Sequence, residues 1–283
     1  MNIVKAAMIG DVVGEQGLET IEAKLPVLIK EQNIEFVTVN GENAAEGFGM
    51  TEKDFQRIIA AGANVVTSGN HIWEKREFWT VLETEGHMLR PANYPSGSST
   101  EQIVSGTGFA SIRIKNINWI TINLQGREFM NAIDCPFQCF DHLINIHVGK
   151  AMDYHPLISA DGKPMPNVFP LILVDFHAES SREKEALAYY VDGRVSLIAG
   201  THTHVQTADE RILPKGSAYI TDLGMTGNLD SVIGMEPKIC LERSRKQVLY
   251  HMETAAEKKP GHLQGVIAEI DAETGRAVSI RRI

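Results

Sequence analysis

The sequence predicts an α/β fold with parallel strands at its core. Short apolar runs alternate with stretches of helical period through residues 1–90, and the runs are almost continuously apolar, as in strands buried on both faces. Polar residues, usually beside glycine, follow five of the runs along the chain, as in α/β proteins that build a site at the carboxyl ends of their strands. With 43% hydrophobic residues among 283, the chain can bury the core of one large domain.

Three buried strands are predicted in the N-terminal third, at residues 6–9, 36–39 and 65–67. A stretch of helical period separates each of them from the next. This strand–helix–strand order indicates a parallel sheet joined by right-handed crossovers.

Two helices are predicted between these strands. In the first, apolar residues within 18–29 share one face, and Pro26 predicts a kink or a late start. The second begins after Thr51, where Asp54 three residues later resembles a capping box, and Gly62 can end it.

The middle of the chain has a different pattern. Residues 109–114 and 117–124 predict two antiparallel strands joined by a tight turn. Residues 125–166 are mixed in composition and predict a loop-rich excursion that serves as a lid or an interface. No repeat, low-complexity segment or linker divides the chain, so residues 1–283 are expected to form a single domain.

Regular elements return in the last third. Residues 171–174 and 195–199 are typical of buried strands, with a helix predicted over 180–193 between them. Residues 265–270 and 277–283 predict a closing hairpin.

Composition excludes several classes of protein. A net charge of −9, from 27 Lys+Arg and 36 Asp+Glu, argues against a general binder of DNA or anionic membranes. The basic run at 243–246 is short and is interpreted as a solvated helix face. No apolar run approaches the roughly 18–20 residues of a membrane helix. Three cysteines cannot close a disulfide framework, and no secretory signal precedes the first strand, so we expect a cytoplasmic protein.

The residues that follow the strands carry the chemistry. Parallel strands end at one edge of their sheet, so side chains that follow different strands can meet there. Four of the ten histidines lie in these turns, and His202 and His204 are spaced to flank a pair of metal ions. The residues expected to converge are Asp11, Glu42, Asn43, Asn70, His71, His177, His202 and His204.

This set is typical of a metal site. Two carboxylates, two amide oxygens and three of the four imidazoles, without a thiolate, suit Mn, Fe, Zn, Ni or Co. The ligands are too many for one tetrahedral zinc, which favours two ions bridged by a carboxylate at about 3.5–4 Å. Two divalent ions and two carboxylates leave a charge of about +2, which would attract an anionic phosphate to an acidic protein.

Each motif also has a structural explanation when taken alone. Asp11 could be an ordinary turn residue, residues 40–43 a polar turn, and His177 a buried structural histidine. Their joint occurrence in five turns favours the metal site. Asp175 and Glu179 flank His177 and are candidates for orienting it.

In their order along the chain, the motifs resemble those of the calcineurin-like metallophosphoesterases, and among them the YmdB-like branch of bacterial phosphodiesterases. They are residues 10–11, 40–43, 69–71, His177 and 200–204, and the resemblance covers nearly the whole chain. Two departures from the broader superfamily resemble this branch. Val13 stands where the Asp-x-His motif has its histidine, and Glu42 stands where most members have a bridging aspartate.

The resemblance implies an αββα sandwich with the metals at the strand ends, and homo-oligomers such as a dimer or tetramer. Fe or Mn is favoured, as divalent or mixed-valence ions, and Zn, Ni or Co also fits. The resemblance makes His71 the catalytic histidine near the leaving group. It also implies that Asp11, Asn43 and His204 hold the first ion, that Asn70, His177 and His202 hold the second, and that Glu42 bridges them.

The resulting hypothesis is a dinuclear-metal-dependent phosphodiesterase that hydrolyses small phosphodiesters. The resemblance favours 2′,3′-cyclic nucleotides, attacked by a metal-bridging hydroxide while His71 donates a proton. The alternatives are a phosphomonoesterase or nuclease on the same centre, a non-enzymatic regulator that binds a nucleotide or RNA, and a flavodoxin-like domain without metal. A panel of para-nitrophenyl esters, cyclic nucleotides and RNA separates the enzymatic alternatives, and metal-dependent turnover discriminates an enzyme from the regulator.

Overall fold

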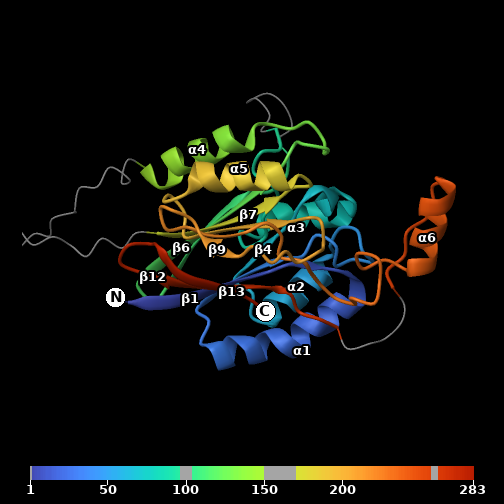
Figure 1. Ribbon diagram of the computed structural model, residues 1–283, viewed down its shortest axis with the longest axis horizontal. Coiled ribbons are helices and arrows are strands. Elements are labelled where there is room, and N and C mark those ends of the chain that lie inside the picture. Colours follow the sequence, from blue (N-terminus) through green and yellow to red (C-terminus); the bar gives the residue numbers. More distant parts are fainter. Residues whose placement is uncertain (1, 96–103, 150–169, 256–260) are drawn as a thin grey trace, which may run out of the picture.

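The computed structural model describes residues 2–95, 104–149, 170–255 and 261–283. It shows two β-sheets packed face to face, with α1 and α2 on one outer side and α4 and α5 on the other (Figure 1). The layers therefore form the αββα sandwich that the resemblance implies.

The first sheet has the strand order β13-β12-β1-β3-β4. The three predicted N-terminal strands are confirmed as β1 (Ile3–Ile9), β3 (Phe36–Asn40) and β4 (Val65–Thr67), which run parallel. The predicted hairpin is also confirmed. Its strands are β12 (Gly265–Asp271), antiparallel to β1, and β13 (Ala277–Arg282).

The second sheet has the order β5-β6-β7-β8-β10-β9, and the predicted antiparallel pair β5–β6 forms one edge. Strands β6, β7, β8 and β10 are parallel, whereas β9 runs antiparallel at the other edge. The strands β9 and β10 had not been predicted. The bounds are β5 Phe109–Ile114, β6 Ile117–Gln125, β7 Leu171–His177, β8 Leu197–Thr201, β9 Arg211–Ile212 and β10 Ala218–Ile220.

The helices over the first sheet are α1 (Gly14–Gln32) and α2 (Glu52–Ala60). The late start predicted from Pro26 is wrong, because α1 begins at Gly14 and runs through the proline. Pro26 lies on the exposed face, where water can bind the carbonyl that lacks its helical donor. The capping box between Thr51 and Asp54 is confirmed.

The helices over the second sheet are α4 (Pro136–His147) and α5 (Ser181–Val191). Helix α4 corrects the expectation of a loop-rich excursion over 125–166. It starts with a proline in its first turn and buries Phe140 and Ile144 against the sheet. The rest of that excursion, 150–166, lies outside the described residues.

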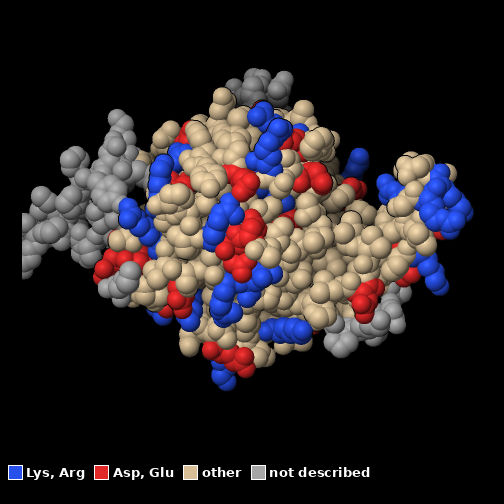
Figure 2. All heavy atoms as spheres, viewed as in Figure 1, with Lys and Arg blue, Asp and Glu red and all other residues tan. Residues whose placement is uncertain are grey.

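Shorter elements surround one end of the sandwich. A two-stranded sheet pairs β2 (Asp11–Val12) with β11 (Met225–Thr226). Helix α6 (Pro237–Lys246) projects from the body (Figure 1), and its basic residues gather on an exposed end (Figure 2). The run at 243–246 is thus a solvated helix face, as predicted. The remaining helices are η1 (Asn70–Trp73), η2 (Arg76–Phe78) and α3 (Trp79–Thr84).

The interior between the sheets is apolar, but it carries polar contacts near the strand ends. The rings of Phe36 and Trp119 stack across the two sheets with centroids 4.8 Å apart. Closer to the ends, Asp175 of β7 accepts hydrogen bonds from Asn40 and Thr67 of the first sheet. These hydrogen bonds therefore join the strand ends of the first sheet to those of the second. None of the helices in the described part of the chain has the length and apolar character needed to cross a bilayer.

Candidate metal centre

The predicted ligands meet where the two sheets end. They come from five parts of the fold, so residues separated by almost two hundred positions become neighbours. Most are inaccessible to solvent, while Asn70 and His202 are partly accessible. The ligand side chains are Asp11 in β2, Glu42 and Asn43 after β3, Asn70 in η1, His177 at the end of β7, and His202 and His204 after β8.

One group of ligands is formed by Asp11, Asn43 and His204. The His204 Nε2 atom lies 3.1 Å from Asn43 Nδ2 and 3.7 Å from Asp11 Oδ1. On its other side, His204 Nδ1 donates to the carbonyl oxygen of Ile233 at 2.8 Å. This bond fixes the tautomer, so the Nε2 lone pair points into the group.

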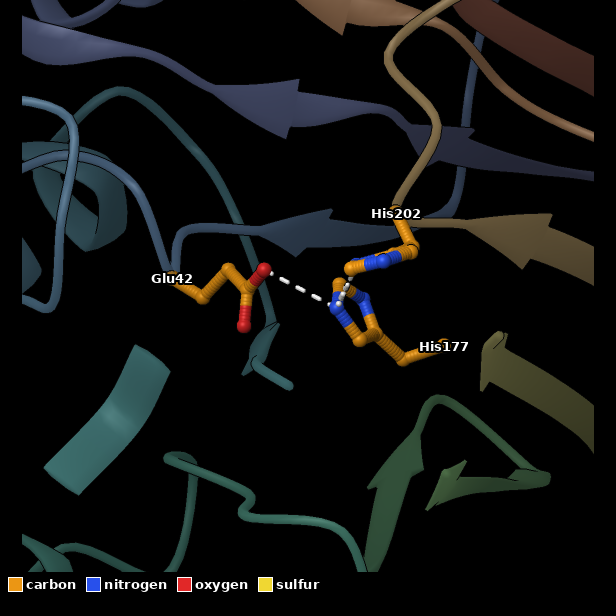
Figure 3. A group of neighbouring side chains, drawn as sticks. All are labelled: Glu42, His177 and His202. Atoms are coloured by element: carbon orange, nitrogen blue, oxygen red, sulfur yellow. Dashed lines mark hydrogen bonds and ion pairs between the residues drawn. The ribbon is translucent and has the colours of Figure 1, made fainter. Parts of the chain in front are cut away.

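A second group is formed by Asn70, His177 and His202. The His177 Nε2 atom lies 3.0 Å from His202 Nδ1 and 3.1 Å from Asn70 Oδ1. Figure 3 shows the two imidazoles turned toward each other, with Glu42 facing them. Ligand atoms of Glu42, His177 and His202 all lie within 4.8 Å of one another.

Glu42 contacts both groups. Its Oε1 atom lies 2.9 Å from His177 Nε2 and also accepts from Asn43 Nδ2 at 3.3 Å. Its Oε2 atom accepts from the backbone N–H of His71 at 3.2 Å. The carboxylate thus stands between the groups, as a bridging ligand would.

Hydrogen bonds outside the cluster orient His177 and His202. Thr201 Oγ1 donates to Asp175 Oδ1 at 2.7 Å and accepts from His177 Nδ1 at 2.9 Å. The His202 Nε2 atom lies 3.2 Å from Glu179 Oε2. The two residues expected to orient His177 thus act differently, since Asp175 reaches it through Thr201 and Glu179 contacts His202 instead. All three imidazoles therefore turn one ring nitrogen inward, as metal-binding histidines do.

The cluster contains more hydrogen-bond acceptors than donated hydrogen atoms that could satisfy them. The His177 Nε2 atom has one lone pair or one proton, yet Glu42 Oε1, Asn70 Oδ1 and His202 Nδ1 all lie within about 3.1 Å of it. Asp11 Oδ1 is buried without a hydrogen-bond partner among the described residues. A cation satisfies such a set where hydrogen bonds alone cannot, so the residues present fit a metal.

The pKa shifts show that the cluster attracts positive charge. Burial raises the pKa of Asp11 to about 6. Burial also acts to raise the pKa of Glu42, but His177 outweighs it and lowers that pKa to about 2. For His177, burial acts to lower the pKa, whereas Glu42 and Asp11 raise it to about 9. Burial and the neighbouring His177 lower the pKa of His202 to about 3. One positive charge between two carboxylates is therefore favoured, and a second proton is not.

Gly69 makes room for the cluster. A Cβ atom at this position would lie 2.3 Å from His177 Nε2 and 2.4 Å from Glu42 Oε2. Any side chain would occupy the space between these two ligands. Position 69 therefore requires glycine because His177 and Glu42 approach its backbone closely, and not because of an unusual backbone angle.

His71 lies beside the ligand cluster and remains accessible. Its side chain is 28% exposed, and Nδ1 lies 3.4 Å from Glu74 Oε1. The ring of Phe48 meets it edge-on with centroids 5.0 Å apart. His71 also borders a cavity of about 760 Å³. Its position suits a group that meets a substrate next to the cluster.

Sequence reasoning missed the residues that hold the turn between His202 and His204. Asp222 Oδ2 accepts from the backbone N–H and the hydroxyl of Thr203, at 3.2 and 2.8 Å. It also accepts from Lys184 Nζ at 2.7 Å, and both side chains of this ion pair are 1% exposed. The two histidines have φ angles of 100° and 63°, which L-residues rarely adopt, so the turn needs such support.

A signal for Asp222 was present in the sequence. Residues 218–220 form an apolar run, and Asp222 follows it as the ligands follow their own strands. Lys184 gives no such signal, because a lysine in a helix is usually exposed.

The whole chain matches proteins of one family. The family model described as YmdB-like protein matches residues 7–283. A 2′,3′-cyclic-nucleotide 2′-phosphodiesterase of Bacillus subtilis is 40% identical over 280 residues, which are 99% of this chain and 96% of the relative.

Solved structures share the fold. A structure described as a novel phosphatase from Mycoplasma pneumoniae aligns with a TM-score of 0.85 and 31% identity, over 100% of this chain and 93% of the other. A 5′-nucleotidase precursor from Thermus thermophilus aligns with a TM-score of 0.57 and 10% identity, over 99% of this chain and 54% of its own, and shows likeness of fold alone. The expected metallophosphoesterase sandwich is confirmed. This chain is a metallophosphoesterase and belongs to the YmdB-like protein family.

Proposed function

We propose that this chain is a dinuclear-metal-dependent phosphodiesterase that acts on small phosphodiesters, above all 2′,3′-cyclic nucleotides. The observation that carries the proposal is the inward orientation of one ring nitrogen from each of three imidazoles beside two buried carboxylates. We assign Asp11, Asn43 and His204 to one ion, Asn70, His177 and His202 to the other, and Glu42 to both. A half-turn of the Asn43 amide presents its oxygen where Nδ2 now lies.

Ions bound there would lower the pKa of water and neutralise charge on the phosphate. The chain's own contribution is to place ligands from two sheets around one point and to supply a proton. His71, beside the cluster and accessible, donates that proton to the leaving oxygen. Because the ligands are buried, the phosphate is bound where water is largely excluded.

The choice of substrate is supported by the B. subtilis relative, whose name specifies 2′,3′-cyclic nucleotides and the bond to the 2′ oxygen. A phosphomonoesterase activity is the second candidate, because the M. pneumoniae structure is described as a phosphatase. Comparing p-nitrophenyl phosphate, bis(p-nitrophenyl) phosphate, 2′,3′-cyclic AMP and RNA, with and without added Mn or Fe, separates these activities. Fe or Mn as the resident metal, a homo-oligomeric state and a cytoplasmic location remain predictions.

The test of the proton donor is His71→Ala. We expect kcat for 2′,3′-cyclic AMP to fall about 10²–10⁴-fold, since that is the usual value of a general acid. The metal content should match that of the parent, because His71 is not assigned to either ion. His87→Ala is the matched control, since His87 is an exposed histidine bonded to the carbonyl of Asn64. Turnover by His71→Ala at the parent rate would refute the assignment.

A further inference from the structure

The cavity beside His71 has walls from two distant parts of the chain. One wall comes from the loop after β3, with Phe48, and from the residues after η1, with Lys75. The opposite wall is the stretch 250–254, which follows α6. At about 760 Å³ the cavity lies within the usual range for small-molecule sites. Of the predicted site residues, His71 alone lines it.

The walls combine an apolar floor with a polar rim. Phe48 and Met252 are partly buried, and they pack on an apolar cluster formed by Val13, Met225, Met235 and Cys240. Tyr250 adds a second aromatic ring to the lining. At the rim, Lys75 Nζ lies 3.4 Å from Glu46 Oε2. Glu74, His251 and Glu253 supply further polar groups. Apolar faces with polar edges are also the chemistry of a nucleobase.

The far wall is tied to the ligand cluster. The carbonyl oxygen of Glu253 accepts from the backbone N–H of Glu236 at 2.8 Å, and Ala255 N–H donates to Gly234 at 3.0 Å. The residue before Gly234 is Ile233, whose carbonyl orients His204. One loop thus holds both a ligand and the wall of the cavity, so their relative positions are set together.

The position of the leaving oxygen determines which part of the substrate enters this cavity. This argument rests on the proposed function. In hydrolysis, the oxygen of water bonds to phosphorus and that water gives up one proton to the solvent. The bond from phosphorus to the 2′ oxygen breaks, and the 2′ oxygen takes the proton from His71. The leaving oxygen must therefore lie beside His71. It is attached to C2′ of the ribose, and the neighbouring C1′ carries the base. The base must then lie on the same side as His71.

We propose that the cavity lined by Phe48, Tyr250 and Met252 is the nucleoside subsite, in which a nucleobase rests on the apolar floor. The subsite lies on the leaving-group side of the metals. It selects nucleotides over phosphodiesters that have the same cyclic phosphate and no base.

The test uses two substrates that share a five-membered cyclic phosphate, namely 2′,3′-cyclic AMP and glycerol 1,2-cyclic phosphate. The variant is Tyr250→Ala/Met252→Ala in the full-length, metal-loaded enzyme. Phe48 is kept, because its ring contacts His71. We expect KM for 2′,3′-cyclic AMP to rise about tenfold, the size of one lost base–aromatic contact. The value of kcat/KM for the glycerol compound should change less than about twofold.

Tyr189→Ala is the matched control, since Tyr189 is an exposed aromatic residue of α5, outside the cavity. It should leave both substrates unaffected. Equal losses for the two substrates in the double variant, or an unchanged KM for the nucleotide, would overturn the subsite.

A binding measurement separates this inference from the proposed function. Calorimetry with 2′,3′-cyclic AMP is done on His71→Ala, with and without the two cavity substitutions. We expect about tenfold weaker binding when the cavity is altered, whether or not the parent turns the compound over. If the parent hydrolyses neither substrate while this difference persists, the proposed function fails and the subsite stands. Equal affinities overturn the subsite.

Discussion

The two ligand groups are held in different ways. In the Asn70–His177–His202 group, side chains orient the imidazoles. Thr201, which is bonded to Asp175, contacts His177, and Glu179 contacts His202. In the Asp11–Asn43–His204 group, backbone provides the support. The carbonyl of Ile233 orients the histidine, and the carbonyl of Gly224 accepts from Asp11 N–H at 3.2 Å. The difference teaches that point substitutions can weaken one group selectively, whereas the other depends on loop conformation.

Loss of the residue that the groups share should have the largest effect. Glu42→Ala removes the carboxylate that contacts both groups, so we expect both ions to be lost and kcat to fall at least about a thousandfold. Elemental analysis of the purified variant and its turnover of 2′,3′-cyclic AMP measure this. Full metal content in the variant would show that Glu42 does not bridge.

Removing a side chain that orients one imidazole should weaken metal binding in one group and not in the other. Thr201→Val keeps the volume and removes the acceptor of His177 Nδ1, so the affinity for one ion should fall about 10–100-fold while the other is unchanged. The control is Thr38→Val, since Thr38 is equally buried between the sheets but contacts Thr121 and no ligand. Calorimetric titration with Mn measures both sites. An equal loss at both would contradict the difference between the groups.

A smaller effect on both groups is expected from Asp222→Asn. Asn retains an acceptor for Thr203 but loses the charge that pairs with Lys184, so the turn carrying His202 and His204 should loosen. We expect each ion to bind about tenfold more weakly, measured by the same titration. Asp192→Asn is the matched control, because this buried carboxylate accepts from Lys215 and Ser217 backbone N–H groups in another loop. A loss of stability common to both variants, without a change in metal affinity, would assign Asp222 to folding alone.

The convergence of the predicted ligands can be foreseen in part for a physical reason. Residues that follow parallel strands share a sheet edge, so Asp11, Glu42 and Asn70 could be placed together from local patterns alone. Spacing does not reveal how the two sheets face each other, which brings His177 to Asp11. It also does not reveal strand order and register within the second sheet, so the contacts of Thr201 with His177 and of Lys184 with Asp222 had no sequence signature.

Two of the elements that differ from prediction show the limits of local rules. Pro26 was expected to kink α1 or to delay its start, but α1 begins at Gly14, and the exposed position of Pro26 makes the lost hydrogen bond tolerable. Helix α4 was missed because its surroundings are polar, although Pro136 marks its first turn and Phe140 and Ile144 lie one turn apart. Tertiary burial decides both cases, and burial is not visible in a short window of sequence.

Each ligand group draws on both sheets, and this has a consequence for how the protein matures. Asp11 and Asn43 follow strands β1 and β3 of the first sheet, and His204 follows β8 of the second. Asn70 follows β4 of the first sheet, whereas His177 ends β7 and His202 follows β8 of the second. Neither group exists until the two halves of the sandwich have docked. A newly made chain therefore offers ions only scattered donors, so we expect metal ions to be captured after the two halves have docked.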